Sequence, residues 1–251
     1  LDLRGALCIE CATLLVAGSG AQDSLAALER WTAPPPAPAA AKIAAAHPPR
    51  VVIVDQPDAV QATVVVGRRT VSRRDPRWAA LRLAGQAVAG AFASRLNLEL
   101  RERLGYTYGI GGGFAPGTDE GLFTVGGSVR TEVAADAVAR LLEGLALREP
   151  FSDAEIDDAR RYLIGVAPLA NETSADIVAQ ASALAAAGLE PGFMNDHFAA
   201  LAAVTPDDAT AAFRDMVPPQ SVGVAVMGDA AALVPALAAV GLAAEVVDLR
   251  G

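Results

Sequence analysis

Residues 90–114 constrain the fold most, because a helical pattern changes there into a strand-like pattern within a few positions. The apolar side chains at helical spacing are Phe92, Leu96 and Leu100. The pattern breaks at Gly105, and the side chains that then alternate as in a strand are Tyr106, Tyr108 and Ile110. The sequence therefore predicts a helix that leads directly into a strand.

This helix-to-strand junction predicts a site that two side chains share. Arg101 falls in the last turn of the predicted helix and Tyr108 just inside the predicted strand, so we expect both to reach one cavity wall. Five glycines line the predicted strand: Gly105, Gly109, Gly111, Gly112 and Gly113. Because glycine has no side chain, another backbone can approach such a strand closely, and a peptide substrate is one candidate.

The junction also resembles a known family. The run SRLNLELRERLGYTYGIGGGF is similar to a segment of the M16 (pitrilysin-like, insulinase-like) zinc metallopeptidases, in which an arginine lies seven positions before a tyrosine, as Arg101 does before Tyr108. Further similar segments follow the family's order: PDAVQATVVVGR, DEGLFTVGGSVRTE, SDAEIDDARRYLIG and VGVAVMGD. The resemblance covers nearly the whole chain and points to the C-terminal half of such a peptidase.

The resemblance implies roles for particular residues. In the family, the arginine and the tyrosine belong to the half that faces the zinc site, and they bind carbonyl groups of the substrate peptide. Arg101 and Tyr108 are accordingly the expected catalytic residues, and Gly111, Gly112 and Gly113 the expected substrate-binding residues. The implied partners are a peptide or small-protein substrate and a zinc-bearing M16 subunit or half, as in a heterodimer.

The zinc-binding motif of the family is absent from this sequence. H-x-x-E-H on a helix places two histidines on one face, with the glutamate as general base. The two histidines here, His47 and His197, are far apart in sequence. We therefore expect no cofactor in this chain, zinc in the partner half or subunit, and no peptidase activity without that partner.

Without the resemblance, the same residues have a structural interpretation. Arg101 could pair with a helix carboxylate such as Glu102, and Tyr108 could belong to the core. A catalytically inactive scaffold subunit of the same fold is thus the alternative function, which the presence of both Arg101 and Tyr108 disfavours. The glycines do not form a phosphate site, because no Gly-Lys-Ser/Thr follows them, and Ser94 has no nearby histidine to activate it.

Charge and hydropathy exclude two classes of partner. The net charge of −9 and the lack of a basic run argue against nucleic acid. No apolar run reaches about 18 residues, so we expect no membrane insertion and a soluble protein of the bacterial cytoplasm or periplasm. Cys8 and Cys11 form an isolated C-x-x-C pair, which could be redox-active or half of a zinc site but is more simply a structural pair of thiols.

A repeated pattern predicts the domain organisation. Residues 11–18 read as a buried strand before a helix over residues 23–31, and the same strand, glycine and helix order returns from residue 221. We therefore expect residues 1–31 to be the closing strand and helix of a truncated upstream domain. Residues 32–49 form a Pro/Ala-rich linker, and residues 50–251 form one domain.

The order of elements within residues 50–251 predicts the fold class. Strands come early, helices come late, and a strand returns near the end. Among the expected helices, one is capped by Asp75, one begins with a capping box of Ser152 and Glu155, one spans residues 193–203 and one starts at Thr205-Pro206. This order favours an α+β fold with a mostly antiparallel sheet and helices packed on one face.

Overall fold

The computed structural model describes residues 13–21, 23, 50–190 and 192–247. The chain divides into two compact units, one of Leu1–Ala46 with Ile164–Asp196 and one of His47–Leu163 with His197–Gly251. The predicted linker, the predicted helix beyond Asp23, Cys8, Cys11 and His47 lie outside the described residues. The proposed domain boundaries and the internal repeat therefore stay predictions.

The described part of the first unit corrects one prediction. Residues 13–17 have no regular secondary structure, and Leu14 is 49% exposed. The predicted buried strand over residues 11–18 is therefore wrong at the described positions, because no described strand pairs with them. Later in this unit, η6 (Ala167–Asn171) packs against α6 (Ser174–Ala186).

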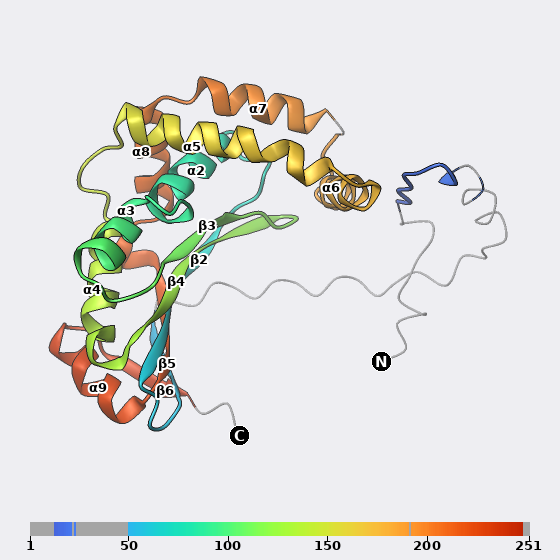
Figure 1. The fold of residues 1–251 in the computed structure, drawn as a ribbon. Helices are drawn as coiled ribbons and strands as arrows, with labels where there is room; N and C mark the ends of the chain where they lie inside the picture. The colour runs from blue at the N-terminus through green and yellow to red at the C-terminus, as the bar shows by residue number, and fades with distance from the viewer. Residues whose placement is uncertain (1–12, 22, 24–49, 191, 248–251) are drawn as a thin grey trace. The chain divides into compact units, whose positions relative to one another are not determined.

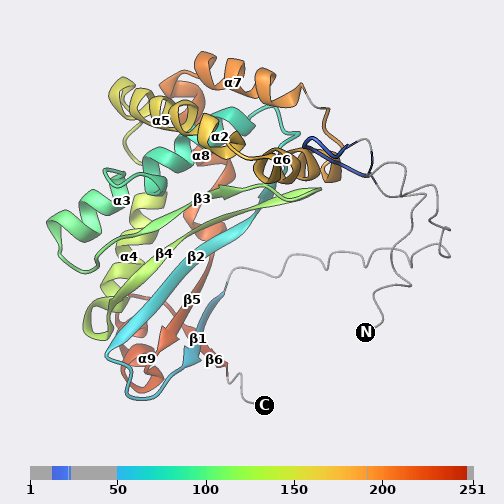
Figure 2. The same ribbon diagram turned by 45° about the vertical axis from the view of Figure 1, so that its right-hand side comes forward.

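The second unit contains a six-stranded sheet, which Figure 2 shows from the strand side. Its strands are β1 (Val51–Asp55), β2 (Gln61–Val71), β3 (Gly111–Ala115), β4 (Glu120–Arg130), β5 (Gly223–Gly228) and β6 (Ala244–Val247). Their order is β3-β4-β2-β5-β1-β6. The pairings from β3 to β5 are antiparallel, whereas β1 pairs in parallel with both β5 and β6. The sheet is therefore mixed.

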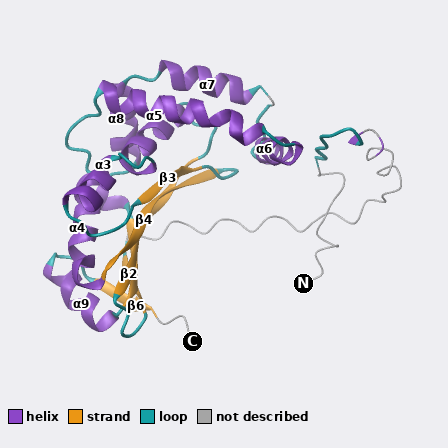
Figure 3. Cartoon of the chain, in the orientation of Figure 1, coloured by secondary structure: helices purple, strands orange, loops and turns teal. Residues whose placement is uncertain are grey.

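The helices of this unit cover one face of the sheet, as predicted (Figures 1 and 3). They are α2 (Trp78–Gly85), η3 (Gln86–Gly90), α3 (Arg95–Asn97), η4 (Leu98–Arg103), η5 (Thr131–Val133), α4 (Ala134–Leu145), most of α5 (Asp153–Val166) and of α7 (Phe193–Ala203), α8 (Pro206–Met216), η7 (Pro219–Ser221) and α9 (Ala230–Ala239). Helix α4 packs on β2 and β4, and α9 packs on β1. The α+β class is confirmed.

The core lies between these two layers. Along β2, Ala62, Val64 and Val66 are fully buried against the helices, while Val65 between them points to the other face. Four phenylalanines extend the core, with Phe213 of α8 in edge-on contact with Phe114, Phe123 and Phe151. Aromatic rings favour this arrangement because the positive edge of one ring meets the negative face of the next.

Short polar side chains set several helix ends. Thr205 caps α8 and Thr173 caps α6, each in a reciprocal pair of bonds with the aspartate three residues later. Asp75 differs from the prediction of a cap, because its carboxylate accepts from the backbone N–H of Arg77 in a turn that precedes α2. Among the described residues, no helix is long and apolar enough to cross a bilayer.

Candidate functional site

The helical segment that carries Arg101 is broken once at its start. Helix η3 ends at Gly90, residues 91–94 are extended or turned, and the helical backbone resumes at Arg95. Leu96 and Leu100 are fully buried and fix the segment on the core. Phe92, which the sequence pattern assigned to the same apolar stripe, is 71% exposed, because the extended residues before Arg95 take it out of the helical period.

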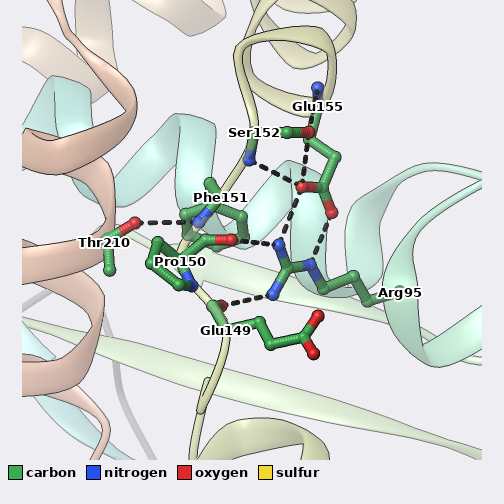
Figure 4. A network of polar contacts seen from close by, with 7 residues as sticks. All are labelled: Arg95, Glu149, Pro150, Phe151, Ser152, Glu155 and Thr210. Atoms are coloured by element: carbon green, nitrogen blue, oxygen red, sulfur yellow. Dashed lines mark hydrogen bonds and ion pairs between the residues drawn. The ribbon is translucent and has the colours of Figure 1, made fainter.

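Arg95 anchors the beginning of this segment (Figure 4). Its guanidinium donates to both carboxylate oxygens of Glu155, at 2.5 and 2.7 Å, and to the carbonyl oxygens of Glu149 and Pro150, both at 2.7 Å. The hydrogen bonds that Glu155 accepts from Arg95, and to a lesser degree from Ser152, hold the pKa of Glu155 at about 2, well below its usual range. Glu155 also accepts from the backbone N–H of Ser152 in the predicted capping box, so Arg95 joins helix α3 to the start of α5.

Arg101 lies one and a half turns further on, with fewer polar partners. Its guanidinium carbon is 3.6 Å from the centroid of the Phe92 ring, within the range of a cation–π contact. Its Nη1 atom is 3.0 Å from Oε1 of Glu102 but makes no hydrogen bond. The pairing with Glu102 that the structural interpretation allowed is thus present as an ionic contact only.

Tyr108 lies on a loop, not within a strand. The predicted strand from Tyr106 is wrong, because β3 begins only at Gly111. The side chain of Thr107 donates to the carbonyl oxygen of Ser128 and accepts from the N–H of Gly109, and the Tyr106 hydroxyl donates to Asp136. Bonds to Ser128 in β4 and to Asp136 in α4 thus hold this stretch as a loop, in place of the ladder bonds of a strand.

The exposure of Tyr108 excludes a core role for its ring. The side chain is 98% exposed, and its hydroxyl makes no hydrogen bond to the described residues. It borders a hollow of about 560 Å³, whose lining is Gln61, Gly105, Tyr106, Thr107, Tyr108, Gly109, Ser128, Val129 and Arg130. Arg101 is not part of this lining, so the structure places the two predicted residues on one helix–loop segment without placing both on one wall.

The three glycines predicted to contact substrate differ from one another. A Cβ atom on Gly112 would lie 2.1 Å from the backbone oxygen of Thr124, so close packing on β4 requires this glycine. Gly113 has a φ of 147°, which disfavours a side chain. Only at Gly111 is the space open, and Gly105 and Gly109 lie in the loop before the strand.

A buried amide that sequence reasoning missed ties the loop to the helix. Asn97 is 5% exposed, and its Oδ1 accepts from the N–H of Ile110 at 2.7 Å while its Nδ2 lies 2.7 Å from the Ile110 oxygen. Nδ2 also lies 3.0 Å from the oxygen of Ala91. A polar residue between the apolar positions Leu96 and Leu100 was the available signal.

The described residues hold no group of three or more histidine, cysteine, aspartate or glutamate side chains placed to bind a metal ion. His197 is half-buried in the first turns of α7. Burial is the main cause that lowers its pKa to about 4, and the positive charges of the nearby Arg82 and Arg73 act in the same direction. The imidazole is therefore neutral at pH 7.

Comparison with known sequences gives two matches. A family model described as the peptidase M16 inactive domain matches residues 17–163. An uncharacterized zinc protease of Streptomyces coelicolor is 29% identical over 159 residues, which cover 62% of this chain and 35% of that protein. The chain thus spans about a third of the length of the curated relative that it matches.

Comparison with solved structures gives the same fold. A peptidase M16 inactive domain from Pseudomonas fluorescens superposes with a TM-score of 0.74 at 25% identity, over 85% of this chain and 52% of that one. A periplasmic protease from Escherichia coli superposes with a TM-score of 0.65 at 16% identity, over 83% of this chain and 24% of that one. A protease from Helicobacter pylori has a TM-score of 0.62 at 16% identity, over 72% and 44% of the two chains.

Proposed function

Because this chain belongs to the peptidase M16 family, whose inactive domain matches residues 17–163, we propose that it is the substrate-binding half or subunit of an M16-type zinc metallopeptidase. In this proposal, Arg101 and Tyr108 bind the substrate peptide on the wall opposite the zinc site. The strand residues Gly111, Gly112 and Gly113 lie along the substrate backbone. A partner half or subunit carries the H-x-x-E-H motif and the zinc ion.

The exposure of Tyr108 carries this proposal. A tyrosine that serves the fold buries its ring and gives its hydroxyl a partner. Tyr108 does neither, being 98% exposed beside a hollow of about 560 Å³. A substrate peptide that fills this hollow would cover the ring and accept a hydrogen bond from the hydroxyl.

The chemistry expected of the two side chains is hydrogen-bond donation. When bound in the partner, zinc supplies an activated water molecule. A guanidinium and a phenol hydroxyl both donate to the substrate carbonyl oxygen, which becomes negatively charged as a tetrahedral intermediate forms. The loss of one such donor costs on the order of 3 kcal/mol of transition-state stabilisation.

The contact between Arg101 and Glu102 favours a second candidate, a scaffold subunit of the same fold. In that case Arg101 stabilises its own helix through the Glu102 carboxylate 3.0 Å away, and the complex needs no donor from this chain. The two candidate functions predict different effects of substitutions at Arg101, Tyr108 and Glu102 on peptide turnover and on stability.

The test is peptide hydrolysis by the chain reconstituted with its H-x-x-E-H partner, measured with a quenched fluorescent peptide. We expect Arg101→Ala and Tyr108→Phe each to lower turnover roughly 10- to 1000-fold, with unchanged assembly and melting temperature. Glu102→Ala is the matched control and should leave turnover within about twofold. Unchanged turnover for both Arg101→Ala and Tyr108→Phe, with equal destabilisation by Arg101→Ala and Glu102→Ala, would leave the scaffold function standing.

A further inference from the structure

The Asn97 side chain contacts both segments that carry the proposed site. Its amide faces Ile110, two residues after Tyr108, and the oxygen of Ala91, one residue before Phe92. Phe92 in turn stacks on Arg101. One buried group therefore lies within hydrogen-bond distance of the loop of Tyr108 and of the segment that supports Arg101.

The hydrogen-bond pattern explains why this group is an amide. The Ile110 N–H requires an acceptor, and the oxygens of Ile110 and Ala91 each require a donor, so the orientation of the Asn97 amide is defined. Nδ2 is also 3.2 Å from the hydroxyl oxygen of the buried Ser94. The two protons of Nδ2 are therefore shared among three acceptors. An aspartate of the same shape would keep the acceptor and lose both donors, and an alanine would lose all of them.

We propose that Asn97 is the positioning residue that fixes Arg101 relative to Tyr108. The amide pairs with Ile110 on both of its polar backbone atoms, as a neighbouring strand would, at the point where the loop of Tyr108 enters β3. Asn97 also precedes Arg101 by four residues, which places the two about one helical turn apart. This role rests on the proposed function of Arg101 and Tyr108. The hydrogen bonds of Asn97 to Ile110 and Ala91, called the clamp below, can be measured without that function.

The alternative is that Asn97 only stabilises the fold. Thr210 in α8 offers a matched control, because it is as buried as Asn97 and its hydroxyl accepts from the backbone N–H of Phe151. This side chain-to-backbone bond involves neither Ile110 nor Ala91. Thr210→Val removes that bond with little change in shape. If variants at Asn97 and at Thr210 lose similar stability, an effect on Arg101 or Tyr108 that only the Asn97 variants show is an effect on positioning.

The first measurement uses the full chain and needs no substrate. Hydrogen exchange of the amides of residues 105–111 and the rate of Arg101 modification by phenylglyoxal are followed by mass spectrometry. We expect both to rise at least about tenfold in Asn97→Ala and Asn97→Asp, since a lost hydrogen bond of about 1.4 kcal/mol corresponds to that factor. Thr210→Val should change neither, and equal increases in Thr210→Val would overturn the clamp.

The second measurement is turnover of the fluorescent peptide by the reconstituted complex. Asn97→Asp should lower kcat about tenfold in the wild-type background and less than about twofold in the Arg101→Ala, Tyr108→Phe background, because the effect passes through those two side chains. An undiminished effect in that background would overturn the positioning role. If Arg101→Ala and Tyr108→Phe do not change turnover at all, the proposed function fails while the exchange data still decide the clamp.

Discussion

Two arginines lie six residues apart on the same helical segment, and their surroundings differ. Arg95 makes four hydrogen bonds to Glu155, Glu149 and Pro150, and its guanidinium lies 4.8 Å from the ring centroid of Phe151. Arg101 also stacks on a phenylalanine, Phe92, but makes only a loose ionic contact with Glu102. The stacking is common to both, and the hydrogen bonds are not.

The aromatic partners show what this difference means. Phe151 is 4% exposed and belongs to the core, whereas Phe92 is 71% exposed. A guanidinium whose three nitrogens all donate to the protein serves the fold, whereas one that is stacked on a ring and keeps unpaired donors can still bind a ligand. The comparison therefore assigns a structural role to Arg95 and leaves Arg101 available for a substrate.

The largest effect on stability should come from Arg95→Ala. The change removes a partly buried ion pair and leaves Glu155 and two carbonyl oxygens without their donor, which should lower the free energy of unfolding by about 3 kcal/mol. Urea denaturation monitored by circular dichroism measures it. A loss below about 0.5 kcal/mol would remove the distinction between the two arginines.

Substitution of Phe151, which stacks on Arg95, should cost more stability than substitution of Phe92, which stacks on Arg101. We expect Phe151→Leu to destabilise the fold by about 1 to 2 kcal/mol, because it opens space beside Phe213, and Phe92→Leu to change stability by less than about 0.5 kcal/mol. Phe92→Leu should nevertheless speed the reaction of Arg101 with phenylglyoxal, since the ring no longer covers the guanidinium. Equal destabilisation by the two variants would contradict the assignment of Phe92 to the surface.

Acid should weaken the Arg95 end of the segment. The pKa of Glu155 is about 2 when folded and ordinarily 4.5, so its contribution is complete above pH 4.5 and is lost as the pH falls towards 2. With solvent screening of these partly exposed side chains, that contribution is about 1 to 2 kcal/mol. Glu155→Gln should be less stable than the wild type at pH 7, and the two should converge near pH 2.

His197 provides the control for that titration. Because its folded pKa is about 4 and its ordinary value 6.5, the unfolded chain binds the proton first, and stability falls as the pH drops from 6.5 to 4. Because the pKa values of Asp75, Glu99 and Asp208 are also lowered, the difference in slope between the wild type and Glu155→Gln at low pH reports on Glu155, and the slope above pH 4.5 reports on His197. Persistence of the lower slope in Glu155→Gln would assign it to another group.

The smallest effect should be that of Arg101→Ala on stability. Its contact with Glu102 lacks hydrogen-bond geometry, and the Glu102 side chain is mostly exposed, so the free energy of unfolding should change by about 0.5 kcal/mol or less. Thermal melts of Arg101→Ala and Arg95→Ala in the same buffer make the comparison direct. A larger loss in Arg101→Ala than in Arg95→Ala would reverse the roles proposed for the two arginines.

The sequence predicted most elements whose signals are local. Helix α7 was predicted with its observed ends, the start of α8 followed from Thr205-Pro206, and the capping box of Ser152 with Glu155 is present. The α+β class followed from the order of these elements. In such cases neighbouring residues alone determine the backbone.

Failures occurred where distant residues decide the structure. The alternation of Tyr106, Tyr108 and Ile110 resembled a strand, but bonds to Asp136, Ser128 and Asn97 hold this stretch as a loop. The parallel pairing of β1 with β5 and β6 depends on residues more than 160 positions away, and β6 was missed. Candidate residues were named from the family resemblance, whereas their supports, Asn97 and Phe92, required the three-dimensional arrangement.

The position of β1 in the sheet has a consequence for how the chain is made. Strands β2, β4 and β3 can pair once residue 130 has left the ribosome, but β1 has no strand neighbour until β5 and β6 are synthesised. Throughout that interval one edge of β2 and both edges of β1 expose unpaired backbone groups, which are templates for association with other chains. Nascent chains should therefore need protection by a chaperone until β5 and β6 emerge, after the segment bearing Arg101 and Tyr108 is already complete.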